Sequence, residues 1–78
     1  MVQEIEADEL TRLVRVRSLT RSGAAKSIRV AAGLSLREVA QSIEVSPATI
    51  LRWERRDRVP QGDRALRYLS VLEGLLRR

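Results

Sequence analysis

Residues 35–54 read SLREVAQSIEVSPATILRWE and contain two short helix patterns separated by a tight turn. The first pattern opens with Ser35 and has Glu38 three residues later, a capping box in which each side chain bonds the backbone of the other residue. The second opens with Ser46, a favoured N-cap residue. Pro47 follows at the first helical position, where no backbone N–H is needed. The spacing therefore predicts two short helices that begin at well-defined residues.

The apolar residues of each pattern fall on one side of its helix. Val39, Ala40 and Ile43 share a face of the first helix, and Ile50 and Trp53 share a face of the second. Two short amphipathic helices packed around a tight turn form a helix-turn-helix, whose second helix can enter the major groove of DNA.

The outward side of the second helix has chemistry that suits DNA. At about 100° per residue, the side opposite Ile50, Trp53 and Glu54 carries small residues first and arginines later. It comprises Ala48, Arg52 and Arg55, flanked by Thr49, Leu51 and Arg56. Arginine binds the O6 and N7 atoms of guanine and also binds phosphate. A solvated basic face has the same composition, but the two caps and the turn favour the DNA-binding interpretation.

A wider set of positions fits the same motif. These are Arg29, Ala32-Gly33-Leu34-Ser35, Glu38-Val39-Ala40, Val45-Ser46, Thr49-Ile50, Arg52-Trp53-Glu54-Arg55 and Pro60. With them, residues 28–60 resemble the phage-repressor and Cro type of helix-turn-helix, also called the xenobiotic-response-element family, and residues 66–72 extend the likeness to a final helix. The resemblance implies base contacts from Pro47, Ala48, Thr49 and Arg52. It implies phosphate contacts from Ser35, Arg37, Ser46, Arg55 and Arg56.

Three departures from that family's pattern concern the target sequence more than the fold. Leu36 stands where a glutamine often anchors DNA, and Pro47 and Ala48 replace the long amides that often read adenine. Glu44 replaces the turn glycine, so a left-handed residue there would cost of order 1 kcal/mol unless the turn relaxes. Arg52 is then the main hydrogen-bonding reader, and guanine is its expected base.

The same resemblance implies a structural ion pair between Arg29 and Glu54. Glu54 falls on the inward face of the second motif helix, where a charged carboxylate needs a partner. We expect the pair to orient that helix.

The chain outside the motif predicts three more helices. Asp8 is expected to cap a first helix over residues 9–20, a second follows over 24–32, and Asp63 is expected to cap a last one over 64–76. The first helix would bury Leu10, Leu13, Val14 and Leu19, although a frayed, partly solvated arm is the alternative there. The expected fold is all-α, a compact lambda-repressor-like bundle of about five helices. Residues 1–78 form one domain, with an acidic, flexible segment at 1–8 and a family-like core at 22–76.

The last helix has more apolar surface than one core face needs. One stripe holds Ala65, Leu66, Leu69, Leu72 and Leu76, and a second beside it holds Tyr68, Val71 and Leu75. The second stripe packs either on the N-terminal helix or on another subunit, because small monomers rarely leave large apolar patches in water. A two-fold dimer reads two half-sites about one DNA turn apart. We therefore expect a homodimer, at least on DNA, through Tyr68, Val71 and Leu75.

Composition supports this function and excludes others. The net charge is +5, and the first nine residues hold four acids and no base, so residues 10–78 carry +9. Such a charge favours phosphate binding, although it also fits a basic protein that is merely soluble. The chain has no cysteine and no histidine. We therefore expect no disulfide, no cysteine or histidine metal site, no cofactor, no small-molecule substrate and no enzymatic activity.

The expected function is sequence-specific binding of double-stranded DNA by a small, cytoplasmic, Cro-like repressor. No apolar run approaches the roughly 20 residues of a membrane helix, so no membrane partner is expected. Three alternatives stay open at this stage: an excisionase-like or architectural DNA binder, the DNA-binding antitoxin of a toxin–antitoxin pair, and a helical protein-interaction module.

Overall fold

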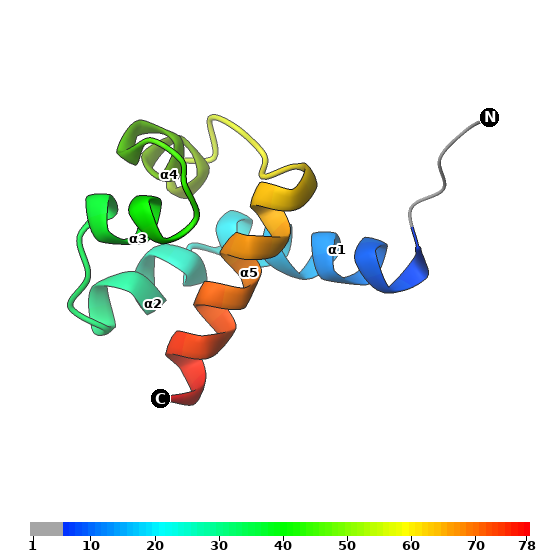
Figure 1. Ribbon diagram of the computed structural model, residues 1–78, viewed down its shortest axis with the longest axis horizontal. Helices are drawn as coiled ribbons and strands as arrows, with labels where there is room; N and C mark the ends of the chain where they lie inside the picture. Colours follow the sequence, from blue (N-terminus) through cyan, green and yellow to red (C-terminus); the bar gives the residue numbers. More distant parts are fainter. Residues whose placement is uncertain (1–5) are drawn as a thin grey trace.

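The computed structural model describes residues 6–78, and all the regular structure in that range is helical. The five helices are α1 (Ala7–Ser22), α2 (Ala24–Ala31), α3 (Leu36–Ser42), α4 (Pro47–Glu54) and α5 (Gly62–Arg77). The long helices α1 and α5 cross, α2 lies against both, and α3 and α4 form a pair at one end (Figure 1). The expected all-α bundle with a helix-turn-helix is confirmed.

All five helices contribute to one hydrophobic core. Its buried members are Leu13, Val16, Ala25, Val39, Ala40, Ile43, Ile50, Trp53, Ala65, Tyr68, Leu69 and Leu72. The inward faces expected for the two motif helices are therefore the ones that are buried. Each fully buried Val, Leu or Ile side chain contributes about 1.5–3 kcal/mol relative to exposure, so the motif helices are held mainly by packing.

Helix α1 differs from its prediction in both its start and its buried face. Glu6 occupies the N-cap without a side-chain hydrogen bond, and Asp8 lies in the first turn, where a carboxylate favours the helix dipole. Residues 7 and 8 of the segment expected to be flexible are helical, and residues 1–5 lie outside the described residues. Leu10 and Val14 are 50% and 65% exposed rather than buried.

Leu13 is buried as expected, and it forms the core face of α1 together with Val16 and Thr20. Their spacing of three and four residues places them on one side of the helix. That side packs on α5 and α2, whereas Leu10 and Val14 point elsewhere. Two apolar stripes were present in the sequence, and tertiary packing selected the one that contains Val16.

Polar contacts also fix α1 to the bundle. Arg15 forms an ion pair with Glu73 at 2.7 Å between Nε and Oε2, and Arg12 donates to the Ser70 hydroxyl at 3.3 Å. The Arg17 Nε donates to the carbonyl of Pro60 at 3.0 Å. These contacts with α5 and the preceding loop make α1 an integral helix rather than a frayed arm.

Helix α5 begins two residues earlier than expected. Gln61 is its N-cap, without a side-chain hydrogen bond, and Asp63 lies within the first turn. Asp63 as the cap is therefore wrong for the same reason as Asp8, since an acidic residue is favourable in the first turn as well as at the cap. Among residues 6–78, no helix is long and apolar enough to span a bilayer.

Candidate DNA interface

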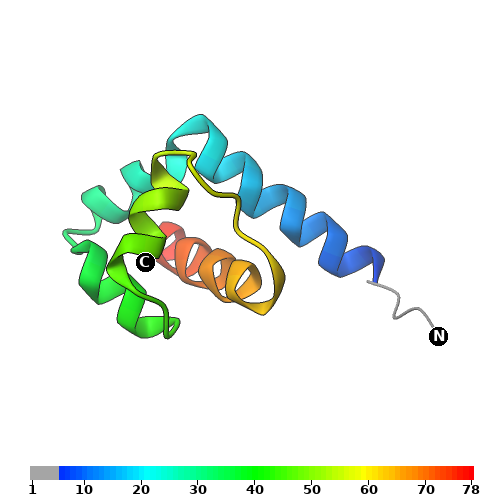
Figure 2. The same cartoon turned by 90° about the horizontal axis from the view of Figure 1, so that it is seen from above.

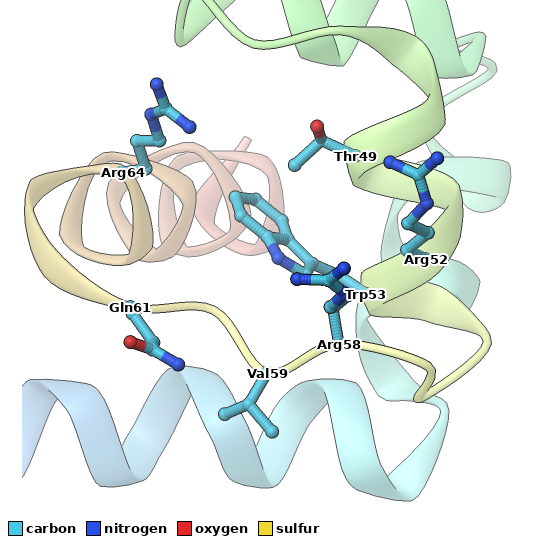
Figure 3. A pocket seen from close by; sticks show the side chains of 7 residues that line it. All are labelled: Thr49, Arg52, Trp53, Arg58, Val59, Gln61 and Arg64. Atoms are coloured by element: carbon cyan, nitrogen blue, oxygen red, sulfur yellow. The ribbon is translucent and has the colours of Figure 1, made fainter.

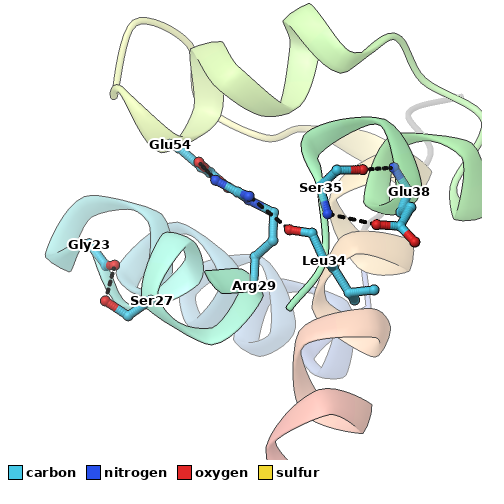
Figure 4. A network of polar contacts seen from close by, with 7 residues as sticks. All are labelled: Gly23, Ser27, Arg29, Leu34, Ser35, Glu38 and Glu54. Atoms are coloured by element: carbon cyan, nitrogen blue, oxygen red, sulfur yellow. Dashed lines mark hydrogen bonds and ion pairs between the residues drawn. The ribbon is translucent and has the colours of Figure 1, made fainter. Parts of the chain in front are cut away.

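The helix-turn-helix is closed by the two caps that its sequence predicts. The Ser35 hydroxyl accepts from the Glu38 backbone N–H at 3.0 Å, and Glu38 accepts from the Ser35 N–H at 2.9 Å (Figure 4). Hydrogen bonding of the Glu38 carboxylate by the Ser35 backbone N–H, and then by its side chain, lowers the pKa of Glu38 below its ordinary value of 4.5. At α4, the Ser46 hydroxyl accepts from the Thr49 N–H at 3.2 Å, with Pro47 in the first turn. Both N-terminal predictions are confirmed.

The turn between α3 and α4 does not relax around Glu44. Its φ is +59°, in the left-handed region where glycine is usual. The Glu44 carboxylate lies 3.2 Å from Arg67 in an exposed ion pair, which contributes little stability. The strain anticipated at this residue is therefore present in the fold.

The inward face of α4 is oriented by Arg29 of α2. Glu54 accepts from the Arg29 Nε at 2.6 Å and from its Nη2 at 2.9 Å, and the Glu54 side chain is only 2% exposed. The Arg29 Nη1 donates to the Leu34 carbonyl at 2.9 Å (Figure 4). The hydrogen bonds to Glu54 raise the pKa of Arg29, so the guanidinium stays charged. One side chain thus links α2, the segment before α3, and α4.

The outward face of α4 is exposed, as its helical spacing predicts. Pro47 and Ala48 are exposed in the first turn, and Arg52 and Arg55 are exposed further along. Thr49 is half-buried at the edge of this face, and its hydroxyl lies 2.9 Å from that of Ser46. The face thus offers small groups at its start and guanidinium groups toward its end.

Arg56 ends this face in an unusual backbone conformation. Its φ is +66°, and its N–H bonds the Trp53 carbonyl while the Asp57 N–H bonds the Arg52 carbonyl. This is the Schellman arrangement that closes a helix C-terminus, in which glycine normally occupies the left-handed position. A non-glycine residue in a strained backbone conformation often indicates that its side chain has a function.

A groove beside α4 brings together residues that the sequence analysis did not single out. It has a volume of about 360 Å³ and lies between α4, the following loop and the start of α5 (Figure 3). Its lining residues are Thr49, Arg52, Trp53, Arg58, Val59, Gln61 and Arg64. Three of them are arginines and none is acidic, so an anion is the ligand that this groove favours. The basic residues at 58 and 64 were visible in the sequence, but their distance from Arg52 depends on how the loop folds back.

The remaining predicted phosphate contacts, Arg37 and Ser35, differ in whether their polar groups are already bonded within the chain. Arg37 lies exposed in the first turn of α3. Ser35 uses both its hydroxyl and its N–H in the capping box, so its role toward phosphate stays a prediction.

The predicted dimer residues do not form a free surface. Tyr68 is 1% exposed, and its ring centroid lies 4.9 Å from that of Trp53. Burial raises the pKa of Tyr68, so its hydroxyl stays protonated. Val71 is half-buried against the core and Leu75 is half-buried. Tyr68 as a dimer contact is therefore wrong, because its side chain is buried in the core of the same chain. A dimer role for Val71 and Leu75 stays a prediction.

Comparison with known families locates the motif. A model of the helix-turn-helix family matches residues 26–74, which run from α2 into α5 and leave α1 outside. Comparison with curated proteins and with solved structures found no match. The family match covers more than half of the chain and coincides with the two capped helices, the Arg29–Glu54 pair and the basic face of α4. The chain therefore belongs to the helix-turn-helix family of DNA-binding transcription regulators.

Proposed function

We propose that the protein is a small repressor of the Cro type that binds a specific two-part operator as a homodimer. The observation that carries this proposal is the outward face of α4. It presents Pro47 and Ala48, which keep the backbone close to base edges, and Arg52, which can bond guanine through two donors. Occupancy of an operator by such a protein blocks polymerase.

The arginines on and around α4 have different proposed roles, according to their positions. Arg52 lies near the middle of the exposed face and is the base reader. Arg58 and Arg64 lie on the loop and on α5 beside it, in the groove of Figure 3, where they face the same side as Arg52. They hold the phosphates of the strand next to the read bases, because phosphate contacts set the position of a recognition helix.

Selection of bound sites from random double-stranded DNA tests the proposal. The wild-type protein should enrich a motif that contains a guanine. Arg52→Ala should lower affinity for that motif by roughly 1–3 kcal/mol and relax the preference at one base. Arg77→Ala is the matched control, because Arg77 is also an exposed helical arginine but lies at the far end of α5 (Figure 1). An unchanged selected motif for Arg52→Ala would remove Arg52 from the reading role, and the absence of any motif for the wild type would remove the specific-binding function.

A further inference from the structure

Helix α1 has a second apolar face that the bundle leaves uncovered. Leu10 and Val14 are four residues apart, so they are neighbours on one face, at 50% and 65% exposure. They point away from the core side of the helix that holds Leu13 and Val16. The first turns of α1 extend beyond α5 in both views (Figures 1 and 2). This helix is also outside the matched family segment, so the family does not explain it.

The charges of α1 indicate what covers this face. Glu6, Asp8 and Glu9 lie at its N-terminal end, and Arg15 and Arg17 lie in its second half. A second α1 that runs antiparallel brings the acidic end of each helix beside the basic half of the other. A parallel arrangement would bring like charges together, which is unfavourable.

We propose that α1 is the homodimer interface, with two copies packed antiparallel across a two-fold axis near residue 12. Leu10 of one copy then faces Val14 of the partner subunit, and the contact occurs twice. The inference rests on the proposed homodimeric function and names the surface that performs it.

The length of α1 suits this arrangement. At about 1.5 Å per residue, Ser22 lies about 15 Å along the helix from residue 12, so the two C-terminal ends are about 30 Å apart. The segment that follows α4 is bonded to that half of α1, since Arg56 donates to the Arg21 carbonyl and Arg17 donates to that of Pro60. Half-sites on successive turns of DNA are about 34–36 Å apart. The separation of the two α1 ends is therefore close to the spacing of half-sites one DNA turn apart.

The proposed contact is small. Two apolar side chains from each copy fall short of the roughly 1,200–2,000 Å² typical of stable complexes. The dimer is therefore weak in free solution and is consolidated when both copies bind one DNA molecule. A test has to trap the contact covalently or to measure it on DNA.

Cysteine trapping tests the contact and its direction. The chain has no cysteine of its own, so single variants report one position each. Leu10→Cys and Val14→Cys proteins are mixed in a thiol–disulfide buffer, and the disulfide products are separated by non-reducing electrophoresis and identified by mass. The yield of the mixed 10–14 disulfide should exceed the yield of the mixed 30–76 disulfide, from an equal mixture of Val30→Cys and Leu76→Cys, by about tenfold or more. The reason is that a specific contact raises the effective concentration of the thiols. Val30 and Leu76 are both 56% exposed and are matched controls.

The same experiment can overturn the proposal. A mixed 10–14 product no more abundant than the control product would mean that α1 does not pair. Dominant self-linked Leu10→Cys or Val14→Cys products would contradict the antiparallel register, and a dominant Leu76→Cys product would place the interface at the end of α5.

A second experiment separates this inference from the proposed function. The double variant Leu10→Gln with Val14→Gln changes no charge and keeps good helix formers. Its affinity for a single half-site should stay within about twofold of wild type, whereas the gain from a second half-site one turn away should fall by about tenfold or more. Val30→Gln with Leu76→Gln should keep that gain. If the wild type binds neither the single half-site nor the paired half-sites, the proposed function fails. Cysteine trapping still tests the α1 contact in that case. If the double variant keeps the gain, the interface lies elsewhere.

Discussion

Arg29 has three donor groups engaged at once, two by Glu54 and one by the Leu34 carbonyl. Because this pair is nearly shielded from water, removal of one partner leaves an uncompensated buried charge. Arg29→Met or Glu54→Gln should each lower the free energy of unfolding by about 3–5 kcal/mol, measured by denaturant titration.

The control for this prediction is the double change Arg29→Met with Glu54→Leu. It removes both charges and should recover much of the loss, since apolar replacements of a buried pair are often tolerated. Near-neutral single variants would show that water reaches the pair in solution.

Single residues also mark what the sequence could and could not predict. The Arg29–Glu54 contact was expected from a family pattern and an angular count, and both caps followed from local chemistry. Tyr68 was assigned to a dimer surface because helical spacing shows that a stripe is apolar but not which neighbour covers it. Leu10 and Val14 were expected to be buried for the same reason, since α1 carries two stripes and its packing partners are distant in sequence.

At the scale of the element, α4 is bounded by two non-glycine residues in the left-handed region, Glu44 before it and Arg56 after it. Replacement of either by glycine should raise the free energy of unfolding by up to about 1 kcal/mol, because the Cβ strain is removed. The two variants should differ from each other in their affinity for DNA. Arg56→Gly should weaken binding to all sequences alike, whereas Glu44→Gly should not weaken it. Thermal melts and binding titrations on the same two proteins check both parts, and a loss of stability in Arg56→Gly would mean that its side chain supports the fold.

The start of α3 has a pH-dependent component. The pKa of Glu38 is lower in the folded chain than its ordinary 4.5, because Ser35 donates to the carboxylate. The capping-box contribution is therefore fully present above pH 4.5 and is lost as the pH falls through the lower, folded value. The stability difference between wild type and Glu38→Gln should shrink from pH 7 toward pH 3. A constant difference over that range would show that the carboxylate charge is not what stabilises the cap.

On the scale of the whole molecule, the arginine groove joins α4, the loop and α5 into one surface that we propose binds phosphate. Arg58→Ala and Arg64→Ala should each weaken binding to specific and non-specific DNA alike. Each should also lower the slope of log affinity against log salt by about 0.9, the effect of one lost phosphate contact. Titrations at several salt concentrations measure the slope, with Arg77→Ala as the unaffected control. A change in base preference instead would make these residues readers.

This groove is also the part of the proposed interface that the sequence analysis missed. Residues 35–56 are local, so caps and helical spacing were enough to place their side chains. Arg58, Gln61 and Arg64 line the same groove as Arg52 only because the loop turns back at Pro60, which is buried and bonded by Arg17 of α1. That contact spans 43 residues, beyond the reach of spacing arguments.

The division of α4 into a fixed inward side and a free outward side has a consequence for how such a protein changes over generations. Glu54, Trp53 and Ile50 hold the helix in place, while Pro47, Ala48 and Arg52 lie outside the core. Substitutions at exposed positions usually alter stability by no more than about 0.5 kcal/mol. Variation at 47, 48 and 52 is therefore nearly neutral for folding, and a duplicated copy can acquire a different DNA preference in a few mutational steps while it remains folded throughout.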